Sequence, residues 1–253
     1  MTVMHPLQVA DIRRESADTV SIAFAVPSHL AATYRFEQGQ YLQLEAQLQG
    51  EPVRRSYSIF SAPDDGELRV AIRHVPQGRF SSYANTQLAV GDTLLVMPPA
   101  GSSYRPEQQQ AQAHHCLGMA SGSGITALLP VIKSTLENDE GSRFTLVYGN
   151  RDRASLLFGE RLAALQALYG QRLELILLFS RESNDNGLPS GRLDLAMCDT
   201  LFREWIDVSR LDAAFLCGPQ AMVETVGAAL KDYGLAAERL HFERLAEPVL
   251  QVC

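Results

Sequence analysis

The stretch that decides the fold is residues 115–136, HCLGMASGSGITALLPVIKSTL. It begins with an apolar run at 115–120, passes through a glycine-containing turn and ends in a helical pattern at 125–136. A strand, a tight turn and a helix in this order begin a βαβ unit. The glycines let the chain turn sharply and let a diphosphate approach the positive end of the helix. A plain strand-to-helix turn is the competing interpretation, because the third glycine of the GxGxxG fingerprint is missing.

The chain after this stretch continues to alternate strands with helices. Further strands are predicted at 143–148, 173–179, 213–217 and 240–243, and helices at 154–168 and 219–233. The run at 173–179 is continuously apolar, as is typical of a strand buried on both faces. Five strands separated by helices predict a doubly wound parallel sheet.

The chain before residue 98 has a different pattern, with short β-rich runs broken by glycine, proline and aspartate. These runs lie at 20–24, 41–44, 57–60, 68–74 and 93–97. Regular short strands with turn signals between them predict an antiparallel β-barrel or sandwich. The polar stretch 101–113 is expected to join the two parts. The predicted organisation is therefore a β-barrel domain at 1–105 followed by an α/β domain at 106–253.

The composition excludes several classes of protein. Of the 253 residues, 46% are hydrophobic and 20% are charged, which predicts a folded chain with enough apolar residues for two cores. A net charge of −7 without a basic run argues against nucleic acid as a partner. The apolar runs are too short to span a bilayer, and residues 1–10 lack the pattern of a signal peptide. Four cysteines, at 116, 198, 217 and 253, have spacings that suit no metal site, so free thiols in a reducing cytoplasm are expected.

Two motifs in the first half indicate a phosphate-bearing aromatic ligand. The string RSYS at 55–58 opens a predicted apolar strand, and strand alternation puts Arg55 and Tyr57 on one face. A guanidinium beside a planar ring can grip a phosphate and offer a stacking surface. The string GRFS at 78–81 precedes a predicted short helix, whose first N–H groups attract anions. The alternatives are a core tyrosine beside a solvated arginine in the first string, and an ordinary turn in the second.

Small and cationic residues follow the predicted strands of the second half. Ligands of open α/β sheets bind beyond the carboxyl ends of the strands. The sequence has YGNR at 148–151, FSRE at 179–182 and CGPQAM at 217–222 in these places. Two arginines at neighbouring strand ends predict a cationic patch for a terminal phosphate, with a pair of solvated surface charges as the alternative.

These strings together resemble the ferredoxin–NADP reductase superfamily, and the resemblance covers nearly the whole chain. Its most specific elements are RxYS at 55–58, GxGxT at 122–126 and CGPxxM at 217–222, in this order. Within the superfamily, the chain is most similar to the phenylacetyl-CoA epoxidase group of oxygenase reductases. The residues 144–151, FTLVYGNR, contribute to that likeness.

The resemblance implies an FAD flavoprotein that takes a hydride from NADPH, or from NADH, and passes electrons singly to a protein such as a ferredoxin or an oxygenase component. It implies catalytic roles beside the flavin and nicotinamide for Ser58, Cys217 and Glu243. For Cys217, an inert buried thiol is the alternative. The implied FAD-binding residues are Arg55, Ser56, Tyr57, Ser58, Arg73, His74, Val75, Gly78, Arg79, Phe80 and Ser81. The implied nicotinamide-nucleotide residues are Gly122, Gly124, Thr126, Asn150, Arg151, Ser180, Arg181, Gly218, Pro219 and Met222. The pair Ser180-Arg181 matches a 2′-phosphate site, which favours NADPH.

The sequence also departs from these relatives. Leu245 stands where they commonly carry an aromatic residue over the flavin, and a proline expected after Thr126 falls at Pro130, which leaves the helix start open. Epoxidase-type reductases continue into a ferredoxin domain, whereas this chain has no C-x4-C-x2-C string, so we expect any iron–sulfur cluster to lie elsewhere. The alternative functions are an electron-transfer fragment of a longer reductase and a nucleotide-sensing subunit.

Overall fold

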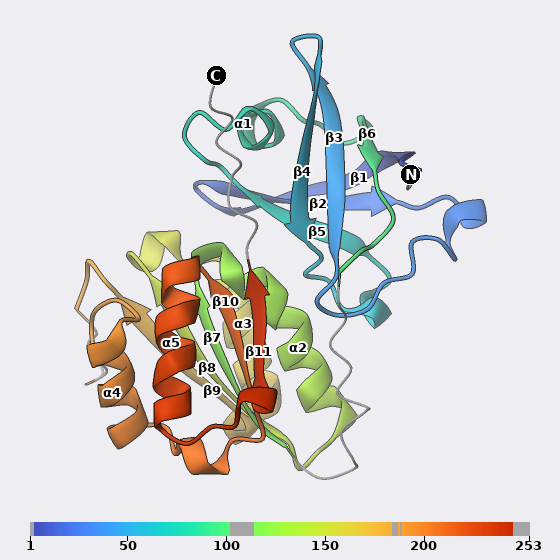
Figure 1. Cartoon of the computed structure of the whole chain (residues 1–253). Coiled ribbons are helices and arrows are strands. Elements are labelled where there is room, and N and C mark those ends of the chain that lie inside the picture. Colours follow the sequence, from blue (N-terminus) through green and yellow to red (C-terminus); the bar gives the residue numbers. More distant parts are fainter. Residues whose placement is uncertain (1–2, 102–113, 184–186, 188, 245–253) are drawn as a thin grey trace.

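The computed structural model describes residues 3–101, 114–183, 187 and 189–244. They form an antiparallel barrel followed by an α/β unit, stacked end to end (Figure 1). The predicted fold class is therefore confirmed. The predicted junction at 101–113 lies almost wholly outside the described residues, and the boundary at 105/106 stays a prediction. No helix in the described ranges is long and apolar enough to cross a membrane.

The barrel consists, within the described residues, of a six-stranded antiparallel sheet in the order β4-β3-β6-β1-β2-β5. Its strands are β1 (His5–Ser16), β2 (Thr19–Ala25), β3 (Tyr41–Leu48), β4 (Glu51–Ser58), β5 (Leu68–Arg73) and β6 (Thr93–Val96). Just after β4, Ile59 bridges to Val70 of β5, which closes the sheet onto itself. The helix α1 (Arg79–Thr86) packs against the barrel and places the buried ring of Phe80 in its core.

The strand that carries the RSYS string differs from the prediction. The sequence predicts it at 57–60, but β4 begins at Glu51 and ends at Ser58, so the string lies at the end of the strand. The reason is the turn at Gln49 and Gly50, whose φ angles of 56° and 82° suit a two-residue hairpin loop. This turn fixes the pairing of Leu48 with Glu51 and extends the ladder through polar residues that lack a strand pattern.

The α/β unit has, in the described chain, a five-stranded parallel sheet in the order β11-β10-β7-β8-β9. The strands are β7 (His115–Ser121), β8 (Arg143–Asn150), β9 (Leu173–Phe179), β10 (Ala213–Gly218) and β11 (Leu240–Arg244). The helices are α2 (Ile125–Asn138), α3 (Gly159–Tyr169), α4 (Leu195–Glu204) and α5 (Gln220–Asp232). The parallel doubly wound sheet predicted from the sequence is confirmed.

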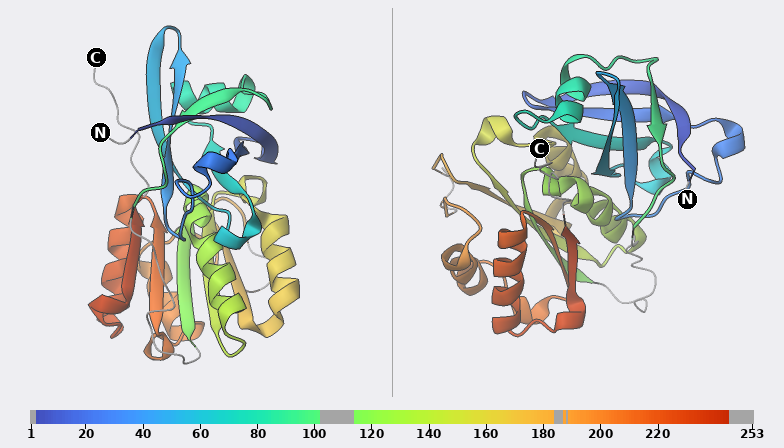
Figure 2. Two further views of the ribbon diagram at one scale, coloured as in Figure 1. Left: turned by 90° about the vertical axis from the view of Figure 1, so that its right-hand side faces the viewer. Right: turned by 45° about the horizontal axis from the view of Figure 1, so that its top comes forward.

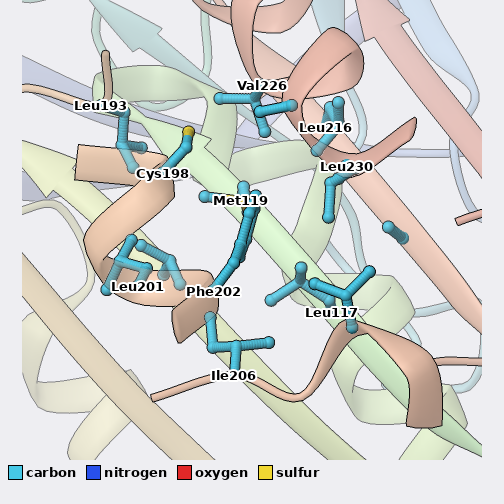
Figure 3. Packing of buried hydrophobic residues seen from close by; sticks show 14 of the residues in the cluster. Leu117, Met119, Leu193, Cys198, Leu201, Phe202, Ile206, Leu216, Val226 and Leu230 are labelled. Atoms are coloured by element: carbon cyan, nitrogen blue, oxygen red, sulfur yellow. The ribbon is translucent and has the colours of Figure 1, made fainter. Parts of the chain in front are cut away.

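The two faces of this sheet have separate apolar cores. Helices α4 and α5 cover one face, where Leu201, Phe202 and Val226 pack against Leu117 and Met119 of β7 (Figure 3). Helices α2 and α3 cover the other face, around the β8 residues Phe144, Leu146 and Tyr148. Because the central strands β7, β8 and β10 are buried on both faces, a ligand can reach them only at their ends.

Two details of the α/β unit differ from expectation, whereas the start of helix α2 agrees with the predicted position. The helix predicted at 154–168 is wrong at its start: a 3₁₀ turn, η5 (Arg153–Ser155), comes first and α3 begins at Gly159. The break is at Phe158, which has φ 59° and directs its ring onto Phe60, with ring centroids 4.8 Å apart. Helix α4 is absent from the sequence prediction. Helix α2 starts at Ile125 despite Pro130, which it carries inside.

The barrel and the α/β unit meet at the carboxyl ends of the parallel strands, where the described chain brings them face to face (Figure 2). Phe60, from the segment after β4, is only 1% exposed and belongs to the same apolar cluster as Cys217 at the end of β10. A polar contact also joins the two parts, a hydrogen bond of 2.9 Å from Ser134 Oγ to Gln38 Oε1. The fold therefore places barrel residues directly against the strand ends where α/β proteins bind ligands.

Candidate functional site

The end of β4 carries the first predicted ligand-binding string. In the β3–β4 register, Arg55 lies opposite Leu44 and Tyr57 opposite Leu42, so both share the face of two fully buried leucines. All four residues from 55 to 58 are nevertheless only half-buried, between the buried Val53 and Ile59. Burial raises the pKa of the Tyr57 hydroxyl, whose ring packs on Phe80 with centroids 5.7 Å apart. This strand end is thus a partly open position in an otherwise filled barrel.

The segment around α1 forms the second part of the barrel site. Gly78 is the N-cap residue directly before the helix, and a Cβ there would lie 2.5 Å from Ser81 Oγ and 3.0 Å from the Val75 carbonyl oxygen. Ser81 Oγ accepts a hydrogen bond of 3.1 Å from the Val75 N–H, so this hydroxyl holds the turn together. No side chain among the described residues caps the helix N-terminus. The turn therefore keeps a close-packed backbone with uncapped N–H groups.

The other predicted residues of this segment have contacts within the protein. Arg79 donates hydrogen bonds to Glu51 Oε2 at 2.7 Å and to the Leu48 carbonyl at 2.6 Å, which ties α1 to the β3–β4 hairpin. His74 Nε2 and Ser82 Oγ are 3.2 Å apart, and the side chain of Val75 is exposed. The side chain of Phe80 lies in the core, so any ligand contact at this residue is through its main chain.

The glycine loop after β7 is held rigidly against neighbouring strands. A Cβ on Gly124 would lie 2.1 Å from the carbonyl oxygen of Cys217, so only glycine fits there. Gly122 has φ 54°, and its carbonyl accepts a hydrogen bond of 2.9 Å from the Tyr148 hydroxyl. The hydroxyl of Thr126 donates to the Ser123 carbonyl at 2.8 Å. Within the described chain no side chain caps the start of α2, so the loop presents backbone groups to a ligand.

The ends of β8 and β9 bring the two predicted phosphate-binding pairs together. The Ser180 N–H donates to the Asn150 carbonyl at 3.0 Å, and the Arg181 N–H donates to the Arg151 carbonyl at 2.8 Å. The side chain of Asn150 is buried near the Tyr148 hydroxyl, but neither its amide nitrogen nor its amide oxygen has a partner at normal hydrogen-bond geometry in the described part of the chain. Since buried amides are normally satisfied, this side chain indicates a place for a ligand.

The end of β10 holds the predicted nicotinamide-facing residues. Cys217 is 0% exposed and Gly218 is packed so closely that a Cβ would lie 2.8 Å from Met222 Cε. Pro219 is exposed and leads into α5. Glu243 pairs in register with Cys217 across β10 and β11, but its side chain lies outside the described part of the structure, as does Leu245. Both interpretations of Cys217, a nicotinamide contact and an inert buried thiol, fit this placement.

The two halves of the site adjoin at Arg73 and Gly122. A Cβ built on Gly122 would lie 3.1 Å from Arg73 Nη1, so the guanidinium at the end of β5 sits against the glycine loop of the other domain. Arg73 Nε also donates to Asp18 Oδ2 at 2.9 Å, and Arg151 Nη2 lies 3.7 Å from the same oxygen. The barrel residues predicted to line a flavin thus touch the loop predicted to hold a nucleotide.

Sequence reasoning missed the residues that join the domains. Asp18 lies in the β1–β2 turn, and Asp65 lies in the 3₁₀ turn η2 (Pro63–Asp65) and pairs with Lys133 and Arg161. Burial opposes ionisation of Asp65, but the hydrogen bond from Lys133 and the two positive charges outweigh it and hold the pKa of this carboxyl below its ordinary value. Turn aspartates are common and their partners lie far along the chain, so no local pattern identifies them.

Comparisons with known proteins agree with this division of the chain. The family model for the oxidoreductase FAD-binding domain matches residues 6–104, and the model for the oxidoreductase NAD-binding domain matches residues 119–227. The chain belongs to the ferredoxin–NADP reductase family of FAD- and NAD-binding oxidoreductases. The predicted family, the enzyme class and the use of FAD with a nicotinamide nucleotide are therefore confirmed. The roles of individual site residues stay predictions.

Two relatives and one solved structure show which members of this family the chain is similar to. Over 253 residues, the chain is 42% identical to one subunit of the 1,2-phenylacetyl-CoA epoxidase of Escherichia coli (strain K12), with 100% of this chain and 70% of the relative covered. It is 34% identical over 239 residues to the 3-ketosteroid-9-alpha-monooxygenase ferredoxin reductase component of Rhodococcus rhodochrous, covering 94% of this chain and 64% of that one. The FAD/NAD-binding domain of nitric oxide dioxygenase from Vibrio cholerae O1 biovar El Tor has the same fold, with TM-score 0.80, 23% identity and coverage of 96% and 99%.

The residues present fit the FAD that the family implies. The turn at Gly78 is so tight that it has no room for a Cβ atom, so the residue there is glycine. The adjacent first turn of α1 has no side-chain cap among the described residues. Arg55 supplies a cation on the same strand face as Tyr57, in a stretch that the protein only half covers. A diphosphate needs backbone N–H groups and a cation, and an aromatic ring system needs a flat neighbour, so the donor set is appropriate.

Proposed function

We propose that this chain is an NADPH-dependent reductase that uses FAD to pass electrons singly to a protein acceptor. When bound, FAD supplies the redox chemistry, because it can take a hydride and return electrons one at a time. The acceptor proposed is a ferredoxin or an oxygenase component. Its support is that the two relatives named above are a subunit of an epoxidase and the reductase component of a monooxygenase.

The observation that carries this proposal is the contact between Arg73 and the loop at Gly122. Arg73 ends a strand of the FAD-binding domain, and Gly122 opens the loop that leads into the first helix of the NAD-binding domain. The guanidinium lies so near this loop that a Cβ added to Gly122 would be 3.1 Å from Arg73 Nη1, which supports placing the ligands of the two domains side by side. Hydride transfer requires such an arrangement, because the reacting atoms of the two ligands must be held about 3–3.5 Å apart.

The protein's own residues would contribute binding and orientation. Arg55 and the N-terminal amides of α1 would hold the FAD diphosphate, with Tyr57 packed on its ring system. Ser58 would donate or accept a hydrogen bond at the flavin, while Cys217 would shape the nicotinamide side and Glu243 would move charge or a proton. The loop at 122–126 and the buried amide of Asn150 would receive the nicotinamide nucleotide.

The preference for NADPH depends on Ser180 and Arg181. Their backbone pairing with Asn150 and Arg151 supports a common phosphate patch at neighbouring strand ends, and the Arg181 side chain is exposed. Replacing Arg181 with alanine is expected to raise the KM for NADPH about tenfold or more while changing the KM for NADH little. Arg210→Ala, at an 80% exposed arginine before β10, is the matched control. An equal rise for both nucleotides would contradict the 2′-phosphate role.

The cytoplasm is the proposed location. Its support is chemical: Cys116, Cys198 and Cys217 are buried thiols that form no disulfide in the described chain. A chain of this family also needs a supply of reduced nicotinamide nucleotide, which a reducing compartment provides.

The decisive experiment is an anaerobic absorption spectrum of the FAD-reconstituted chain during titration with NADPH. Loss of the visible flavin band on addition of about one equivalent, followed by reduction of a one-electron dye, is the expected result. A protein that binds FAD and NADPH without bleaching would favour the nucleotide-sensing alternative. A protein that retains no flavin after reconstitution would contradict the proposal at its first step.

A further inference from the structure

Asp18 is a carboxylate whose two oxygens are both occupied. Oδ1 accepts hydrogen bonds from Ser16 Oγ at 2.9 Å and from Thr19 Oγ1 at 3.1 Å. Oδ2 accepts from Arg73 Nε at 2.9 Å and lies 3.7 Å from Arg151 Nη2. The first pair of contacts fixes the carboxylate in its turn, so the second pair presents a fixed negative charge to arginines from both domains.

These arginines lie beside residues proposed to receive the nicotinamide nucleotide. Arg73, from the barrel, lies against the glycine loop at Gly122, and Arg151 follows β8 directly after the buried Asn150. The Arg73 and Arg151 side chains are 27% and 50% exposed, so both remain accessible to a ligand from solvent.

The charge balance of this group sets how strongly it attracts an anion. Two guanidinium groups and one carboxylate leave a net charge of +1, and removal of the carboxylate charge would leave +2. Burial opposes the ionisation of Asp18, but hydrogen bonds from Arg73 and Ser16 and the charge of Arg73 outweigh it, so its pKa is below the ordinary value. The carboxylate is therefore ionised at neutral pH and competes with phosphate oxygens for the same donors.

We propose that Asp18 is a positioning residue that holds Arg73 and Arg151 beside the glycine loop, where the two domains meet, and moderates the affinity of this site for nicotinamide nucleotides. An incoming nucleotide diphosphate shares or takes the guanidinium donors, and the carboxylate recovers them as the oxidised nucleotide leaves. This inference rests on the proposed function, since it assigns a role toward the same nucleotide. It predicts that the wild-type chain binds the oxidised nucleotide less tightly than Arg73 and Arg151 would bind it if Asp18 carried no charge.

Asp18→Asn in the FAD-loaded full chain tests the proposal, because asparagine keeps the oxygen that accepts from Ser16 and Thr19 but removes the charge. We expect NADP⁺ to bind about 3- to 10-fold more tightly by titration calorimetry at low salt. The gain should shrink at high ionic strength, because exposed charges are screened. A structural role alone would weaken binding, so the sign of the change separates the two explanations.

Two further variants complete the test. Arg151→Ala in the Asp18→Asn background should remove most of the gain, since it deletes one of the released cations. Asp65→Asn, at the other cross-domain carboxylate, should leave the NADP⁺ affinity within about twofold. If Asp18→Asn retains too little FAD to measure, Asp18→Ser offers a second small, turn-compatible replacement.

The outcomes distinguish this inference from the proposed function. Unchanged or weaker NADP⁺ binding by both Asp18 variants, with normal binding by the wild type, would overturn the role of Asp18 alone. No NADP⁺ binding by the wild-type chain would instead overturn the proposed function.

Discussion

Asp65 and Asp18 both bind cations of the α/β domain from turns of the barrel, but their surroundings differ. The Asp65 side chain is 19% exposed and pairs with Lys133 and Arg161. Arg161 in turn lies over the ring of Phe60, which packs at a tilt on Phe158. The Asp18 side chain is 33% exposed and has its pairs beside the glycine loop. Apolar packing reinforces the first contact, whereas the second consists of hydrogen bonds and ion pairs.

This difference shows how one interface can be firm and still admit a ligand. Around Phe60, apolar burial and ion pairs act together, so separating the domains there would expose rings and leave charges unpaired. Around Asp18, the cations are Arg73 and Arg151. They can exchange the Asp18 carboxylate for a phosphate of the ligand without exposing apolar surface. We therefore expect substitutions near Phe60 to change stability and substitutions near Asp18 to change nucleotide affinity.

The largest effect on stability is expected from Phe60→Ala. The ring is 1% exposed and fills the cluster that joins the domains, so its loss should lower the free energy of unfolding by about 3–5 kcal/mol. Urea unfolding of the FAD-free chain measures the change. Phe242→Ala, at a ring that is 48% exposed on β11, is the control and should cost about 1 kcal/mol or less. Equal losses for the two variants would mean that Phe60 does not join the domains.

A smaller effect is expected from Asp65→Asn. The change leaves Lys133 and Arg161 without their common carboxylate in a half-buried place and should cost about 1–2 kcal/mol, or a fall in Tm of about 2–8 °C. Differential scanning calorimetry measures it. Asp64→Asn, at the exposed neighbouring carboxylate, should change Tm by about 2 °C or less. A large shift in the NADP⁺ affinity of Asp65→Asn would contradict the division of roles between the two carboxylates.

The contribution of Asp65 should also depend on pH in a definite direction. Its pKa is lowered in the folded chain, so its stabilising effect is complete above the ordinary carboxyl pKa of about 4 and is lost as pH falls through the lowered value. The stability difference between wild type and Asp65→Asn should therefore be constant from about pH 8 to pH 5 and then shrink. Unfolding curves of both proteins across this pH range test the prediction. A stability difference that grows on acidification would contradict the lowered pKa of Asp65.

The smallest effect is expected from Arg161→Ala. Its guanidinium carbon lies 5.7 Å from the Phe60 ring centroid, and its nitrogen lies 3.4 Å from Asp65, but its side chain is 38% exposed. We expect a loss of about 0.5–1 kcal/mol and a coupling of about 0.5 kcal/mol with Asp65 in a double-mutant cycle. Arg203→Ala, at a 69% exposed arginine paired with Asp199, is the control without a cross-domain partner. A coupling energy near zero would mean that Asp65 stabilises the fold through Lys133 and not through Arg161.

Local patterns in the sequence predicted most of the fold. The strand, glycine turn and helix at 115–136 appear where expected, because apolar runs, glycines and helical periodicity act over a few residues. Helix α4 also had a local signal that was missed: Asp194 accepts a hydrogen bond from the Met197 N–H, and Met197, Cys198, Leu201 and Phe202 form its buried face.

Features set by distant partners could not be predicted in this way. Phe158, which has φ 59°, packs on Phe60 from the other domain, and the pairing of Asp65 with Arg161 joins residues 96 positions apart. The same limit applies to the candidate site. Its strings were visible, but the contact of Arg73 with Gly122 and the competition at Asp18 arise only where the two domains meet.

Phe60 also has a consequence for the newly made chain. Its ring follows the last residues of β4 and belongs to a cluster whose other members come from residues 116–217. Because synthesis runs from the N-terminus, the barrel can fold while these residues are still unmade, and Phe60 then faces water as an apolar patch. The nascent barrel therefore keeps this ring uncovered until β10, with Cys217, has been made and completes the shared core.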